Sequence, residues 1–131
     1  MKNFRLQIIT PERIFFDQDV YMAEFNTTEG EIGVYADHIP MMCILKPGVL
    51  TIRMEGEAKE AALHSGFAEI LPDKVTILAE AIEWPEEIDE ARAEAAMARA
   101  KERIAHPTSQ TDIARAQTAL LRAMARITVI K

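Results

Sequence analysis

The distribution of glycine and proline divides this chain in two. All 5 glycines, and each of the 6 prolines except Pro107, lie before residue 86. Both residue types favour turns and disfavour helix interiors, so the first part is expected to hold short elements joined by turns. Residues 86–104 consist mainly of Ala, Glu, Arg, Met and Lys, which are strong helix formers. We therefore expect two domains, 1–84 and 85–131.

The first part carries the signature of an antiparallel β-structure. Apolar and polar residues alternate with a period of two, and turn residues recur every 8–12 positions. Gly30 and Gly33 are expected in a turn between strands. This pattern predicts a β-sandwich or a β-barrel. The clearest alternating stretches are Phe4–Ile8, Leu50–Met54 and Val75–Ala79.

The second part predicts two helices. Pro85 suits the first helical turn, and the acidic residues that follow complement the positive end of the helix dipole. Residues 106–109 interrupt the pattern, and Ser109 or Thr111 is expected to cap a second helix that ends near Ile127. So short a connection requires the helices to fold back as an antiparallel hairpin or to straighten apart.

Composition excludes several classes of protein. The single cysteine, Cys43, excludes an internal disulfide framework and favours a reducing compartment. No run of about 18 apolar residues is present, and the first residues lack the apolar core of a signal peptide, so we expect a cytosolic protein. The net charge of −6 argues against general nucleic-acid binding, and the helical part lacks aromatic residues for base stacking.

No arrangement of residues points to catalysis. The 3 histidines are scattered, and none lies at metal-ligand spacing from Cys43 or from another histidine. No glycine-rich loop that could hold phosphate is present. We therefore expect a protein that is not an enzyme, with no catalytic residue, no metal site and no prosthetic group.

Arginine stripes are the most distinctive feature of the helical part. Each predicted helix carries three arginines at positions i, i+7 and i+11, along one face over about 16 Å. Two facing stripes of arginines would repel each other unless they flank an anion or point apart. The simpler alternative to a binding surface is that these arginines lie on a solvated helix surface. Phosphate groups of a small ligand or carboxylates of a protein partner would fit them. The stripes are Arg92, Arg99 and Arg103, and Arg115, Arg122 and Arg126.

The seam between the two helices is expected to be weak. It is predicted to consist of alanines, which permit close approach but bury little apolar area. Closed and opened forms of the hairpin would then differ by only a few kcal/mol. The predicted seam residues are Ala91, Ala95, Ala98, Ala116, Ala119 and Ala123.

Four segments of the first part follow one another in a recognisable order: Gly30–Val34, His38–Pro40, His64–Glu69 and Pro72–Ala79. In sequence and spacing they resemble the ε subunit family of bacterial F-type ATP synthases. The resemblance implies an antiparallel β-sandwich followed by a two-helix hairpin. It also implies a rotor subunit of the central stalk at the cytoplasmic face of the membrane, touching the membrane only through the complex. Such a subunit couples proton flow to ATP synthesis and inhibits ATP hydrolysis through its mobile hairpin. The sandwich would contact the γ subunit and the c-ring, and the hairpin the β subunit.

The resemblance also implies site residues. Residues 88–93, Ile-Asp-Glu-Ala-Arg-Ala, match the motif of family members that bind ATP in the folded hairpin. The motif leaves open whether magnesium accompanies the nucleotide. The implied nucleotide-binding residues are Glu83, Ile88, Asp89, Arg92, Ala93, Arg99, Arg122 and Arg126. The implied partner-contact residues are His38, Arg115, Arg122 and Arg126. The alternative is a purely structural stalk adaptor with a permanently folded hairpin and no regulation by nucleotide.

Overall fold

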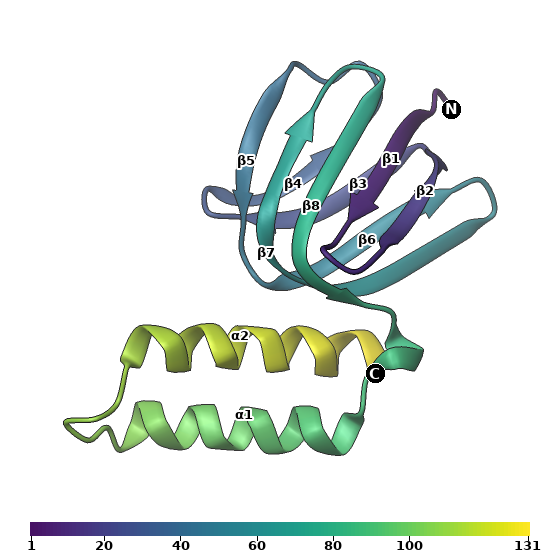
Figure 1. Ribbon diagram of the computed structural model, residues 1–131. Helices are drawn as coiled ribbons and strands as arrows, with labels where there is room; N and C mark the ends of the chain where they lie inside the picture. Colours follow the sequence, from purple (N-terminus) through teal and green to yellow (C-terminus); the bar gives the residue numbers. More distant parts are fainter.

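A computed structural model describes residues 1–131 and has a β-sandwich of eight strands followed by two helices (Figure 1). The predicted fold class is confirmed. Apolar positions of the alternating stretches face the interior, so that Leu6, Ile52 and Ile77 are fully buried. The strands are β1 (Phe4–Ile9), β2 (Ile14–Val20), β3 (Met22–Thr27), β4 (Gly30–Val34), β5 (Met41–Leu45), β6 (Gly48–Met54), β7 (Glu57–Ile70) and β8 (Lys74–Glu83).

The long strand β7 connects the two layers of the sandwich. The first half of β7 pairs with β6 and its second half with β5. Strand β8 pairs antiparallel with β7 along nearly the whole length of β8. One pair departs from the antiparallel expectation, because β1 lies parallel to β8. Between the layers lies a continuous apolar core of 20 buried residues.

A backbone kink lets β7 change layers. Ser65 and Gly66 have φ values of 42° and 140°, in the region that side chains disfavour. A Cβ at Gly66 would overlap the carbonyl oxygen of Leu78 on β8. The expectation that Gly30 and Gly33 lie in a turn is wrong for Gly33, which lies inside β4 opposite Glu24 of β3.

The helical part begins later than predicted. Pro85 opens a short 3₁₀ turn, η1 (Pro85–Glu87), and α1 (Glu90–Ala105) starts only after Asp89. The Asp89 carboxylate accepts a hydrogen bond of 3.1 Å from the Arg92 amide, which is the role of an N-cap. The cap therefore separates the 3₁₀ turn from the helix.

The second helix, α2 (Ile113–Ile130), is capped by Asp112 rather than by Ser109 or Thr111. The Asp112 carboxylate accepts from the amide of Arg115 at 3.1 Å. The Thr111 hydroxyl instead accepts from the amide of Thr108 within the connecting loop. The helix also continues three residues beyond the predicted end, since no glycine or proline follows Ile127 and Val129 is buried.

Helix α2 lies between the sandwich and α1, so the hairpin forms a third layer and α1 is its outer member (Figure 1). The predicted seam is right for α2, where Ala116 and Ala123 are buried, but wrong for α1, where Ala93 and Ala100 are the buried alanines. The phase of α1 is set by Met97 and Ile104, the larger side chains on its half-buried face. Neither helix is long and apolar enough to cross a membrane.

We predict that Gly66→Ala destabilises the sandwich by roughly 2 kcal/mol or more, because the added Cβ meets backbone and φ is unfavourable. Denaturant unfolding followed by circular dichroism measures the loss. Gly33→Ala is the matched control: nothing lies within 4 Å of its added Cβ. Equal losses in the two variants would contradict this account of the kink.

Candidate functional site at the junction of sandwich and hairpin

Glu83, at the end of β8, joins three elements through one carboxylate oxygen. Its Oε1 accepts from Arg126 Nε of α2 at 2.7 Å and from His64 Nε2 of β7 at 2.8 Å. His64 is only 1% exposed, whereas the Glu83 side chain is 27% exposed. A second ion pair, of 3.7 Å, joins Arg122 of α2 to Glu80 of β8. These contacts fasten α2 to the last strand of the sandwich.

The environment sets the charges of this junction. Burial alone would raise the pKa of Glu83, but the hydrogen bonds from Arg126 and His64 outweigh burial and lower the pKa. Burial lowers the pKa of His64, although the hydrogen bond to Glu83 opposes this change. Glu83 is therefore ionised and His64 neutral at neutral pH. Because a carboxylate can only accept, His64 carries its proton on Nε2.

The hairpin is also attached by a small apolar cluster. Ala62 of β7 packs against Ala125 and Val129 of α2, with Val49, Ile88 and Ile130 at the edge. Small side chains bury little area, so this cluster contributes much less than the sandwich core. The interface between the two parts thus combines a small apolar cluster with the ion pairs of Glu80 and Glu83.

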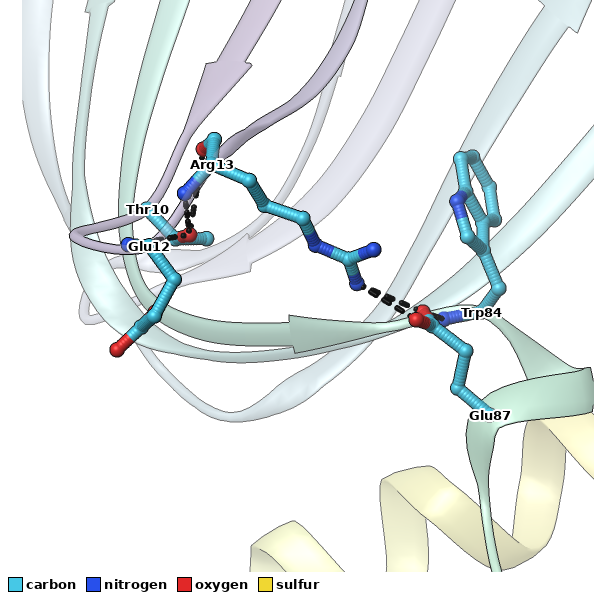
Figure 2. A network of polar contacts seen from close by, with 5 residues as sticks. All are labelled: Thr10, Glu12, Arg13, Trp84 and Glu87. Carbon is cyan, nitrogen blue, oxygen red and sulfur yellow. Dashed lines mark hydrogen bonds and ion pairs between the residues drawn. The ribbon is translucent and has the colours of Figure 1, made fainter.

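A separate network holds the linker to the sandwich (Figure 2). Arg13 Nη2 donates to both carboxylate oxygens of Glu87 at 2.8 Å, and Glu87 accepts from the Trp84 amide at 2.9 Å. The Trp84 ring stacks on Phe15 with centroids 4.3 Å apart. The Thr10 hydroxyl accepts from the Arg13 amide and orders the β1–β2 turn that carries Arg13. Residues 84–87 therefore belong structurally to the sandwich.

The predicted nucleotide-binding residues divide into two groups. Glu83, Arg122 and Arg126 are engaged in ion pairs between β8 and α2, and Ile88 packs beside them on the small apolar cluster. Ala93 is buried in the hairpin seam. The second group, on the outer helix, comprises Asp89, whose Oδ1 caps α1, and the guanidinium groups of Arg92 and Arg99, which are exposed and unpaired.

The predicted partner-contact residues lie in different places. Arg115, with Arg103, His106 and Arg122, lines an open groove of about 930 Å³ at the loop end of the hairpin. His38 lies in the β4–β5 connection, partly exposed, and its Nδ1 is 2.7 Å from the carbonyl oxygen of Ile39. The anionic partners of Arg122 and Arg126 in this structure are the protein's own Glu80 and Glu83.

An exposed apolar row on the sandwich was not predicted from the sequence. Ile44, Phe67 and Leu78 are cross-strand neighbours on β5, β7 and β8, and are 64%, 41% and 37% exposed. Met42, two residues from Ile44 on β5, is 64% exposed. The signal was the run of five apolar residues in β5, because a strand with one solvated face should alternate.

The fold and the junction define a two-domain class in which a β-sandwich carries a helical hairpin, fastened by a shared carboxylate. Two family models match the chain: the β-sandwich domain of the ATP synthase delta/epsilon chain over residues 3–85, and its long α-helix domain over residues 86–131. The chain therefore belongs to the delta/epsilon family of ATP synthase chains.

Relatives of similar length support this assignment. The ATP synthase epsilon chain of Ruminiclostridium cellulolyticum is 45% identical over 97% of this chain and 95% of its own length. The ATP synthase epsilon chain of Caldanaerobacter subterraneus is 44% identical over 98% of this chain and 94% of its own length. A chain in the cryo-EM structure of the Euglena gracilis mitochondrial ATP synthase (OSCP/F1/c-ring) shares the fold, with a TM-score of 0.83 at 24% identity, over 94% of this chain and 78% of that chain.

We predict that Asp89→Ala lowers the stability of the hairpin by about 1 kcal/mol, because the Arg92 amide loses its acceptor. The loss appears as earlier melting of the helical circular dichroism signal. Glu86→Ala, which removes a nearby exposed carboxylate without a capping role, serves as the control. An identical effect of both substitutions would mean that charge near the helix start, rather than the cap, is responsible.

Proposed function

We propose that this chain is a non-catalytic rotor subunit in the central stalk of the F-type ATP synthase. It helps to couple proton flow to ATP synthesis, and its hairpin inhibits ATP hydrolysis when it leaves the sandwich. The observation that carries the proposal is unequal attachment: a cluster of 20 buried residues holds the sandwich, but only 3 buried residues link it to α2. The hairpin can therefore depart while the sandwich stays folded.

The proposed partners use different surfaces. The γ subunit and the c-ring contact the sandwich, and the exposed row of Ile44, Phe67 and Leu78 supports such a contact because apolar rows of this kind mark protein interfaces. His38 adds a contact from the neighbouring connection. The subunit thereby sits peripherally at the cytoplasmic face of the bacterial membrane, without binding nucleic acid.

The third proposed partner is the β subunit. When α2 leaves the sandwich, Arg122 and Arg126 lose Glu80 and Glu83 and become available to carboxylates of another protein. Arg115, already exposed, extends the same basic surface. The released hairpin would then present all three arginines at once.

We further propose that ATP binds the docked hairpin. Arg92 and Arg99 offer unpaired guanidinium groups to phosphate, and the second oxygen of Asp89 remains able to accept from an amino group such as that of adenine. Arg122 and Arg126 would complete the set by sharing their charge between the β8 carboxylates and the nucleotide. A ligand of the docked form alone favours docking.

The second candidate function is a structural stalk adaptor whose hairpin never leaves the sandwich. The two ion pairs between β8 and α2 favour it, because they already give Arg122 and Arg126 carboxylate partners without any ligand. Under this alternative, ATP has no effect and the hairpin does not regulate hydrolysis.

ATP is expected to raise the melting temperature of the isolated protein, because a ligand at 100 times its Kd stabilises the bound form by about 2.7 kcal/mol. Differential scanning fluorimetry at increasing ATP measures the shift. Arg92→Ala should abolish it, whereas Arg103→Ala, on the same helix but outside the proposed set, should preserve it. No shift at millimolar ATP would contradict nucleotide binding.

A disulfide that locks the docked hairpin should relieve inhibition. In a Cys43→Ser background, Ala62→Cys and Val129→Cys replace two residues of the same buried cluster. A synthase that contains the oxidised variant should hydrolyse ATP faster than one that contains the reduced variant, because the locked hairpin stays on the sandwich. Each single-cysteine variant controls for the oxidant. Equal rates in both states would favour the structural adaptor.

A further inference from the structure

His64 lies under α2 with only half of its hydrogen-bonding capacity used. Nε2 donates to Glu83, whereas Nδ1 is buried and has no hydrogen-bond partner. The ring is 1% exposed, in the stretch of β7 against which α2 packs. An acceptor nitrogen without a partner is tolerable in a neutral ring, but the same nitrogen when protonated needs an acceptor.

The charges around His64 come from three places. On β8, Glu83 is already shared with Arg126. On α2, the positive charges of Arg126 and Arg122 both act on the ring. On the side of β5 and β6, the segment between Leu45 and Gly48 contributes only Lys46, which is exposed. A second proton on the ring would give it a positive charge that faces two guanidinium groups and one carboxylate that is already engaged.

Docking of the hairpin thus opposes protonation. With α2 removed, the stretch of β7 that carries His64 loses its cover, and Arg122 and Arg126 no longer face the ring. We propose that protonation of His64 releases α2 from the sandwich, so that the docked hairpin is favoured at neutral and alkaline pH and weakened by acid. This inference rests on the proposed function to the extent that the hairpin must be able to leave.

The direction follows from the pKa of each group. In the docked form burial lowers the pKa of His64, the hydrogen bond to Glu83 opposes that change, and the charges of Arg126 and Arg122 lower it further. Docking is therefore fully favoured above the ordinary histidine pKa of about 6.5 and is lost progressively below it. The pKa of Glu83 is itself lowered, so Glu83 stays ionised through this range.

Thiol labelling of a buried cysteine measures the open fraction. In the full chain with Cys43→Ser, Ala62→Cys puts a thiol beneath α2, and Thr28→Cys provides an exposed reference that corrects for the pH dependence of thiol reactivity. The ratio of reference to buried labelling rates is the protection given by docking. Between pH 6.5 and 5.5 this protection should fall by about fivefold, because a water-exposed histidine with a pKa of about 6.5 is already half protonated at the start of this interval.

His64→Gln should make the protection independent of pH, because the amide still donates to Glu83 but does not titrate. His106→Gln and His38→Gln, which remove histidines away from the junction, should retain the pH dependence. An NMR titration of the His64 ring provides a second measurement that needs no cysteine. A ring that titrates at or above about 6.5 in the docked protein would overturn the proposal.

The labelling outcomes distinguish this inference from the proposed function. If the protection does not change with pH but is lower in Arg126→Ala, the pH-dependent release is overturned, whereas the proposal of a mobile hairpin stands. The same pH profile in His64→Gln as in the native chain would also overturn it. No labelling of Ala62→Cys in any variant or at any pH would mean that the hairpin never leaves, and would overturn both.

Discussion

The single carboxylate oxygen that Glu83 offers to His64 and Arg126 governs the relation between the two parts of this protein. A half-buried carboxylate is costly unless it is paired, and its two partners come from opposite sides of the junction. His64 belongs to the sandwich and stays in place, whereas Arg126 arrives only with α2. Glu83 therefore has both partners only when the hairpin is docked, which makes docking specific without requiring a large apolar interface.

The linker divides this structure at a defined point. Arg13 and Trp84 hold Glu87 on the sandwich, and Asp89 caps α1 two residues later. Ile88 thus lies between η1, which is attached to the sandwich, and Asp89, which caps the first helix of the hairpin. Any departure of the hairpin would rotate the backbone here, with η1 left behind. Because Ile88 also packs against the Ala62 cluster, its side chain reports directly on whether α2 is docked.

Sequence reasoning succeeded where local pattern determines structure. Alternation identified the interior faces of β1, β6 and β8, and composition located the change from sheet to helix. It failed where two local rules compete. Pro85 and the acidic residues after it resemble a helix start, but Asp89 offers the better cap and the helix begins there. The parallel pairing of β1 with β8 leaves no local trace, because alternation is the same in either direction.

The arrangement of the arginines required the tertiary structure. The spacing of the arginines predicts that those of each helix lie on one helix face. What each face contacts, however, depends on α2 being the middle layer. With α2 packed on the sandwich, Arg122 and Arg126 meet carboxylates of their own chain, whereas Arg92, Arg99 and Arg103 on the outer helix are exposed and unpaired. The same limit applies to β5, whose apolar run is informative only once Ile44 is seen beside Phe67.

Internal pairing changes what an anionic partner must do to bind. Glu80 and Glu83 are tethered to the same chain as Arg122 and Arg126, so they compete at a high effective concentration. A partner with a single carboxylate would be at a disadvantage against them. A partner that engages Arg115 as well gains a contact for which the sandwich has no counterpart, since Arg115 is unpaired when docked. The three arginines of α2 therefore differ in the docked structure: Arg115 is exposed and unpaired, whereas Arg122 and Arg126 are paired with carboxylates of β8.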